Sequence, residues 1–317
     1  MRKFIVACFI SIMTISCVSQ NNRNINEHIL TLKNSYCKAP HHYNYSNKIP
    51  SYNSDSILAS NADLKSNFSD QSILILNALE SLDEVRTINH LKQDSTLLSR
   101  VKVLELKNSI NSKITIALTE LDAVAAEFDC EGERVEQMAS YVQNINDNRT
   151  NKLVFYSIVA GAAASVAGGI VKSEGWGSAI DITGGALGAG LGFATLSPKG
   201  KKVEFIHQRN LLRDIWNSKL ESDNFPPFVW YMYTEKKFSN NTDQSIIENI
   251  KERWLHFNFE NNIDEANHSV NFSSGGEYRA NDLYNRSRML NQMQSATRTI
   301  NQNINYLLLD LDKLVLY

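Results

Sequence analysis

Signature motifs of catalysis are missing from this sequence. It contains no HExxH, paired CxxC or GxSxG motif, and no acidic repeat with the spacing of a calcium-binding loop. The run from Gly188 to Gly192 is rich in glycine but lacks the GxGxxG spacing of a dinucleotide loop. The histidine pair His41-His42 has no partner cluster in the sequence. We therefore expect neither an enzyme nor a metal or cofactor site.

An excess of one charge is missing as well. The 34 acidic and 32 basic residues give a formal net charge of −2 over 317 residues. A large positive excess would point to nucleic acid or to an anionic membrane surface, and the chain as a whole has none. We expect no nucleic-acid partner. The length allows one large core or two domains.

Charged side chains are absent from two stretches, residues 153–171 and 182–198. A polar, turn-like segment separates them, so residues 152–202 are predicted to form a central helical hairpin. Small residues recur at every fourth position in each arm. They therefore share one helix face and let two backbones approach closely. These glycine-zipper positions are Ser157, Gly161, Ser165 and Gly169 in the first arm, and Gly184, Gly188 and Gly192 in the second.

Two environments for the hairpin stay open. A bilayer could accept it, although a spanning helix needs about 20 apolar residues and the first arm only just supplies them. A soluble helical bundle could instead bury the hairpin as core. In water each glycine would cost up to ~1 kcal/mol relative to alanine, so either environment must compensate through packing.

The start of the chain has the order of an export signal. Two basic residues, Arg2 and Lys3, precede an apolar core from Phe4 to Ile15, and a small residue follows. Residues 1–16 are therefore predicted to direct export and not to form part of the fold.

The residues Thr14-Ile15-Ser16-Cys17 resemble the lipobox of bacterial lipoproteins. The resemblance implies that Cys17 becomes the lipidated first residue of the mature chain, so a membrane lipid would be a partner. It also implies a location in the cell envelope. The outer membrane facing the periplasm is favoured, because Val18 is not the aspartate that retains some lipoproteins at the inner membrane. An ordinary cleaved signal is the alternative.

Cysteine is scarce, with four residues in the chain. With Cys8 in the signal and Cys17 lipidated, Cys37 and Cys130 remain. An oxidising envelope compartment would allow a disulfide between them, fastening the N-terminal segment to the helix that carries Cys130. Two buried thiols are the alternative. Residues 17–56, rich in Asn, Ser and Tyr, are expected to be a flexible tether.

Hydrophobic periodicity predicts helices through the rest of the chain. Residues 57–90 and 203–220 read as amphipathic helices, a short helix is expected from Pro227, and 242–257 reads as another. Heptad stripes, typical of coiled coils, mark a long helix before the hairpin and a last helix over about 277–315. The first stripe is Ile110, Ile114, Ala117, Leu121, Val124, Phe128, Glu131, Val135, Met138, Val142 and Ile145. The second is Leu283, Arg286, Leu290, Met293, Thr297, Ile300, Ile304, Leu307, Leu311 and Leu314.

The expected fold is all-α, an elongated helical bundle or coiled coil with the glycine-zipper hairpin at its centre. Long helices fill 57–151, short helices and loops 203–276, and a coiled-coil helix 277–317. The long helix is expected to continue across the polar joint 146–151 into the first hairpin arm. The mixed charges of 131–134 are expected on an exposed helix face, and Asp310 at a solvated or salt-bridged surface.

Three functions fit this layout. The first is a structural or assembly role for a lipid-anchored envelope protein, whose hairpin contacts a membrane, other envelope proteins or a second copy of the chain. In its layout from about residue 57 onward, the chain also resembles α-helical pore-forming toxins of the haemolysin type. That resemblance implies a hairpin that is packed away in the soluble form and inserts into a membrane on assembly. The third is a soluble binding module with the hairpin as core.

Overall fold

The computed structural model describes residues 37, 53–170, 200–207, 209–219, 221–241 and 243–314, and only the backbone of 157–170. These residues are mainly helical, which confirms the expected all-α helical bundle. Outside the described residues lie Cys17, His41-His42, and the turn and second arm of the hairpin with Gly184, Gly188 and Gly192.

The chain divides into two compact units. The first comprises Met1–Arg134, Ile206–Gly275 and Asn285–Tyr317, and the second comprises Val135–Phe205 and Gly276–Tyr284. Each is described by itself below.

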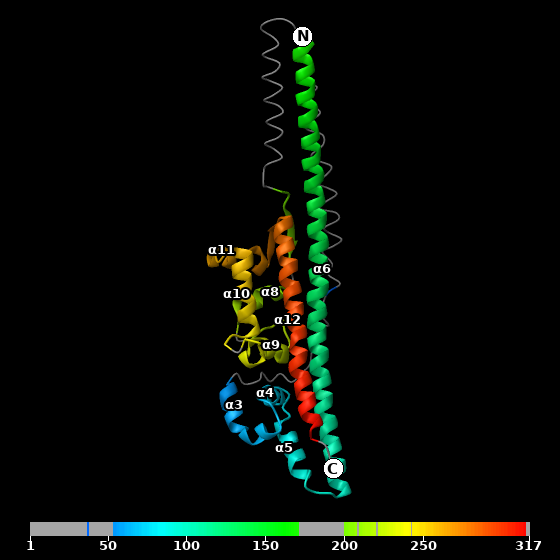
Figure 1. The fold of residues 1–317 in the computed structure, drawn as a ribbon, viewed down its shortest axis with the longest axis vertical. Helices are drawn as coiled ribbons and strands as arrows, with labels where there is room; N and C mark the ends of the chain where they lie inside the picture. Colours follow the sequence, from blue (N-terminus) through cyan, green and yellow to red (C-terminus); the bar gives the residue numbers. More distant parts are fainter. Residues whose placement is uncertain are drawn as a thin grey trace. The chain divides into compact units, whose positions relative to one another are not determined.

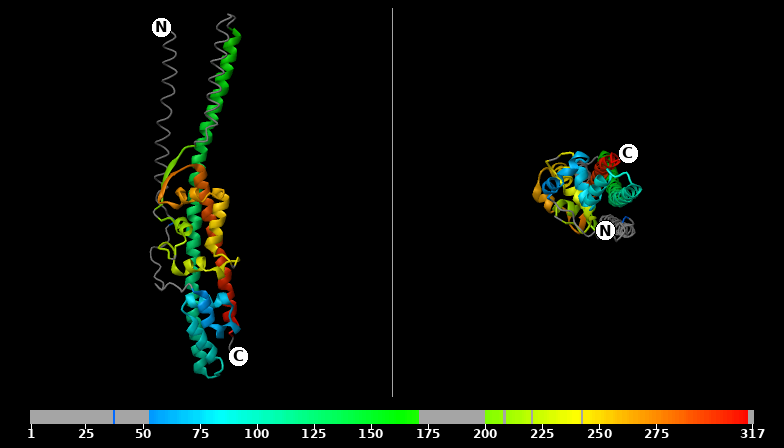
Figure 2. Two further views of the ribbon diagram at one scale, coloured as in Figure 1. Left: turned by 90° about the vertical axis from the view of Figure 1, so that its left-hand side faces the viewer. Right: turned by 90° about the horizontal axis from the view of Figure 1, so that it is seen from below.

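Two long helices form the centre of the first unit, α6 (Leu97–Ile170) and α12 (Ala280–Asp312), and lie side by side (Figures 1 and 2). Lys107, near the start of α6, donates a 2.8 Å hydrogen bond to the carbonyl of Leu314. Further along α6, a Cβ atom on Gly132 would stand 2.5 Å from Asn291 Oδ1, so glycine permits close approach there. Contacts at higher residue numbers on α6 thus involve lower residue numbers on α12. The pairing is antiparallel, an orientation that the sequence left open.

Both predicted heptad stripes are core. Every position of the α12 stripe is buried, and so is the α6 stripe except Glu131 and Ile145, which are partly exposed. The two polar positions of the α12 stripe bind other elements. Thr297 shares a hydrogen bond with Tyr233, and Arg286 donates to the Asn271 carbonyl at 2.7 Å. We call the line along which the α6 and α12 stripes meet the seam. It is apolar where it buries leucine and isoleucine, and polar where further segments attach.

The single helix expected over 57–90 is wrong. This segment forms α3 (Ser54–Ser60), the 3₁₀ turn η1 (Ala62–Ser66), α4 (Asp70–Ala78) and α5 (Leu82–Leu91). Polar caps cause the breaks, because the Ser69 side chain accepts a hydrogen bond from the Ser72 N–H and starts a new helix there. Glu80, with φ of 50°, turns the chain between α4 and α5.

Asp310 holds the start of α4 to α12. It is 7% exposed, and its Oδ2 accepts hydrogen bonds from Ser69 N at 3.1 Å and Ser72 Oγ at 2.7 Å. An ion pair with Lys313 at 2.8 Å remains. The expected salt-bridged surface residue is thus also a buried link between two helices.

The helix expected over 203–220 is replaced by a strand and a shorter helix. Strand β1 (Val203–Ile206) pairs with β2 (Gly275–Tyr278), and α8 spans Leu211–Asn217. Burial alternates along β1, with Val203 and Phe205 buried and the residues after each exposed, which is the period of a strand. This two-residue period is short enough to be mistaken for part of a helical pattern.

The remaining elements of the first unit are short. They are α9 (Pro227–Thr234), η2 (Lys236–Phe238), α10 (Ile246–Phe259), α11 (Ile263–Asn267) and η3 (Val270–Phe272). Helix α9 begins at Pro227 as predicted. Its aromatic residues are buried, and the rings of Phe225 and Trp230 stack at 5.1 Å between centroids. They form a packed core.

Two carboxylates are buried on α6 beside its apolar stripe. Glu120 is 2% exposed and Glu127 6%, and one oxygen of each has no hydrogen-bond partner among the described residues. Burial raises the pKa of Glu120 to about 8. Burial also raises the pKa of Glu127 to about 7, although Arg209, 3.3 Å away, acts in the opposite direction. Glu120 therefore favours the protonated, uncharged form inside the fold at neutral pH, whereas Glu127, which is paired with Arg209, changes charge near neutral pH.

The substitution Glu120→Gln should make stability less dependent on pH. Because the pKa of Glu120 is raised on folding, the folded chain keeps a proton that the unfolded chain releases above about 4.5. This contribution is fully present below that pH and is lost as pH rises to about 8. We expect the variant to be more stable than the parent at pH 9 by ~1–3 kcal/mol, and nearly equal at pH 5, in urea unfolding.

The matched control for this measurement is Glu136→Gln, at an exposed position of the same helix. It should leave the pH dependence as in the parent. Equal slopes of stability against pH for the parent and Glu120→Gln would contradict the assignment of a buried, protonated carboxyl.

Candidate functional site

The base of the predicted hairpin belongs to the second unit. Helix α6 runs without a break through the polar joint 146–151 and on to Ile170, so the expected continuation into the first arm is confirmed. Ser157, Gly161, Ser165 and Gly169 lie within this helical backbone. The first arm is thus not a separate helix but the end of α6.

A polar clasp joins the two ends of the segment 152–202 that is predicted to form the hairpin. The Asn146 side chain accepts a 2.9 Å hydrogen bond from the backbone N–H of Lys201, 55 positions later. A Cβ atom on Gly200 would stand 2.8 Å from Asn146 Nδ2, so a larger residue there would displace the Asn146 side chain. The returning chain is therefore fixed to α6 where the polar joint begins.

The strand pair extends the clasp. Lys202 and Glu277 form an ion pair at 2.7 Å across the two strands, and the Phe205 and Tyr278 rings pack edge to face at 6.0 Å. These contacts hold the chain that leaves the hairpin. Lys202 was expected to mark the end of the hairpin, and the structure gives it this ion-pairing role.

Exposed aromatic side chains lie just beyond the clasp on α6. Phe155 is 62% and Tyr156 56% exposed, and Val154 is 40% exposed. The charged side chain before them, Lys152, is also exposed. Aromatic residues next to a basic residue are typical of membrane interfaces, and exposed aromatics also mark protein contacts. These residues lie in the first turn of the uncharged arm 153–171, outside the positions of its small-residue stripe.

The described parts of the chain contain no helix that is both long and apolar enough to cross a membrane. Within the same parts, no group of His, Cys, Asp and Glu side chains could hold a metal ion.

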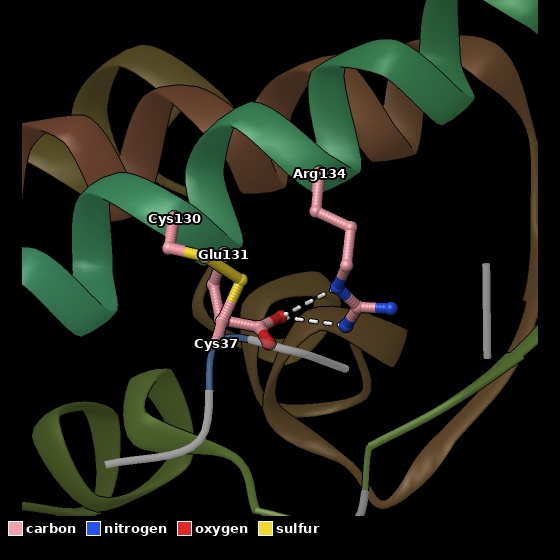
Figure 3. Close-up of a disulfide and its surroundings, with 4 residues drawn as sticks. All are labelled: Cys37, Cys130, Glu131 and Arg134. Atoms are coloured by element: carbon pink, nitrogen blue, oxygen red, sulfur yellow. Dashed lines mark hydrogen bonds and ion pairs between the residues drawn. A yellow bond between two sulfur atoms is a disulfide. The ribbon is translucent and has the colours of Figure 1, made fainter. Parts of the chain in front are cut away.

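In the first unit, Cys37 and Cys130 are joined by a disulfide, with Cα atoms 5.5 Å apart (Figure 3). The bond lies next to an ion pair within α6, in which Arg134 Nη2 and Glu131 Oε2 are 2.6 Å apart. Of the two alternatives for these cysteines, the structure has the bonded one. It ties the segment around residue 37 to α6.

The charged run 131–134 lies only in part on an exposed face, because Glu133 is exposed and Glu131 is half-buried. Arg134 is 5% exposed, and Gly132 lies against α12. His207 is also buried, and desolvation with the charges of Arg286 and Arg134 lowers its pKa to about 2. The seven-residue spacing of Lys113, Glu120, Glu127 and Arg134 places them on one side of α6. This spacing could have predicted the burial of the last three, whereas Lys113 is partly exposed.

The geometry of both units defines the class of this protein as an all-α helical bundle. No protein-family model, curated protein or solved structure matches the chain.

Removing the clasp should loosen the chain that returns from the hairpin. In Asn146→Ala the Lys201 N–H loses its acceptor, and we expect its hydrogen exchange to become about fivefold faster, since one hydrogen bond contributes ~1 kcal/mol. Asn144→Ala, at an exposed position one half-turn earlier, is the control and should leave exchange unchanged. Equal exchange in both variants would show that the clasp does not protect this strand.

Removing the disulfide should destabilise the first unit. The bond closes a loop with a sequence separation of 93, for which chain entropy predicts a stabilisation of about 4.6 kcal/mol. Cys37→Ser, Cys130→Ser and the double variant should all lose the same amount in urea unfolding. A gel without reductant should show slower migration for each than for the parent. Loss in one single variant alone would indicate a packing effect of that side chain.

Proposed function

We propose that this chain is a lipid-anchored structural or assembly protein of the cell envelope. In this proposal Cys17 carries the lipid, in the outer membrane facing the periplasm. The apolar hairpin makes the contact on which the function depends. Its partner is either a bilayer or another envelope protein, including a second copy of the chain.

The observation that carries the proposal is the continuity of α6. Its earlier turns are fixed by the seam with α12, and the same helix extends into the uncharged arm. A helix that is already formed can be extended at low cost, because nucleation is the expensive step. An arm that is rich in small residues can therefore be presented as a helix, with its surface available for close packing.

The exposure at the base of the arm supports an external contact. Phe155 and Tyr156 are more than half exposed, although aromatic side chains of this size are usually buried in a monomer's core. Burying them would contribute roughly 1.5–3 kcal/mol each. A contact that begins at these residues and continues along the arm would use both the aromatic and the small-residue surfaces.

The test uses the mature chain with Cys17→Ser, which removes the lipid, mixed with dye-loaded liposomes. Flotation measures binding to the bilayer, dye release measures pore formation, and sedimentation measures self-association in solution. Gly188→Leu places a bulky side chain on the small-residue stripe of the second arm. We expect it to weaken flotation, self-association or both by about tenfold or more, because close backbone approach is lost.

The outcomes separate the candidate functions. Flotation without dye release, or self-association, that depends on Gly188 supports the proposal. Dye release that Gly188→Leu abolishes would replace it with pore formation. Equal behaviour of the parent and Gly188→Leu in flotation, release and sedimentation would reject the hairpin as the contact on which the function depends. A control, Phe257→Gln, removes an exposed apolar side chain on α10 and should behave as the parent.

A further inference from the structure

A second exposed apolar surface lies in the first unit, at the start of α6. Four large apolar side chains within eight residues are more than half exposed, from 53% at Val101 to 80% at Leu98. Single exposed apolar residues are ordinary, whereas a contiguous group marks a contact surface. We call this group the α6 apolar face. Its members are Leu97, Leu98, Val101 and Leu104.

The face points away from the core. Leu97, Val101 and Leu104 are spaced by four and three, so they form one stripe along the helix. The same turns bury Ser99 and Val103. These first turns of α6 therefore bury one side against the fold and expose a second side that is apolar.

Basic side chains flank the face. Arg100 and Lys102 are both exposed in the same two turns, and Lys102 pairs with Glu105 at 3.0 Å. Over residues 92–107 four basic residues stand against two acidic ones. This local excess contrasts with the net charge of −2 of the whole chain. An amphipathic helix with leucines between basic residues fits an anionic lipid surface, in which the apolar side chains enter and the cations meet head groups.

The proposed lipid anchor is close enough to bring a bilayer to this face. Twenty positions separate Cys17 from Cys37, a reach of up to roughly 70 Å when extended. Cys37 is bonded to Cys130 on α6. Cys130 lies 26 positions beyond Leu104 on the same helix, or about 39 Å at 1.5 Å per residue. A membrane that holds the lipid can therefore be reached by the α6 apolar face.

We propose that the α6 apolar face lies on the anionic lipid surface in which the chain is anchored. This inference rests on the lipid anchor of the proposed function, and it adds a second, non-covalent membrane contact that is separate from the hairpin.

The experiment uses the full mature chain with Cys17→Ser and vesicles of either pure phosphatidylcholine or an equal mixture with phosphatidylglycerol. In the double variant Leu98→Gln/Val101→Gln, flotation with the anionic vesicles should fall at least ~10-fold. The reason is that two apolar side chains, which would enter the bilayer in the parent, are replaced by polar ones. Arg100→Gln/Lys102→Gln should weaken binding to the anionic vesicles alone and remove its sensitivity to salt. Phe257→Gln is the matched control at an exposed apolar site elsewhere, and circular dichroism checks the fold of each variant.

Three results would overturn the inference. One is a parent chain that does not float with anionic vesicles. Another is flotation of Leu98→Gln/Val101→Gln equal to that of the parent. The third is a parent dimer, seen in sedimentation without vesicles and lost in that double variant while flotation persists, since the face would then bind a second copy. Gly188→Leu distinguishes the two proposals, because it tests only the hairpin, whereas the double variant tests only the α6 apolar face.

Discussion

The packing of the α12 stripe against α6 is the interaction on which the rest of the first unit depends. Each fully buried leucine or isoleucine contributes roughly 1.5–3 kcal/mol, and all ten positions of the α12 stripe are buried. The seam also fixes where other segments attach. Arg286 reaches the Asn271 carbonyl and Asn210, and Thr297 meets Tyr233, so the shorter elements are bound at the two polar positions.

The charged residues beside the seam follow the same seven-residue repeat. Lys113 pairs with Glu84 of α5 at 3.1 Å, and Glu127 pairs with Arg209, which precedes α8. Lys113, Glu84 and Arg209 are each partly exposed, so solvent screens the attraction and each pair contributes little net stability. Their effect is therefore to select which segment packs against which turn of α6, while the apolar stripe supplies the stability.

The sequence predicts the seam well because periodicity over many turns averages out local exceptions. It fails where one or two residues decide. A serine cap and one left-handed residue split the helix expected over 57–90, and four alternating residues make β1 out of an expected helix. Within 131–134 the sequence does not predict that Arg134 is buried, because burial is decided by segments that are distant in the sequence, such as that of His207. The clasp at Asn146 pairs residues 55 positions apart, so no local sequence pattern predicts it.

The small residues of the arm would be a poor choice for an independent helix. Gly161, Gly168 and Gly169 each weaken helix formation by up to ~1 kcal/mol relative to alanine, and a helix of this length is marginal in water. Continuity with α6 removes the nucleation cost but not the propensity cost. The remaining deficit must be met by packing against the glycine stripe, and close backbone approach is the one interaction that glycine allows and alanine or leucine hinders. In the proposed contact, the same residues that weaken the arm alone would therefore be the ones that make the packing specific.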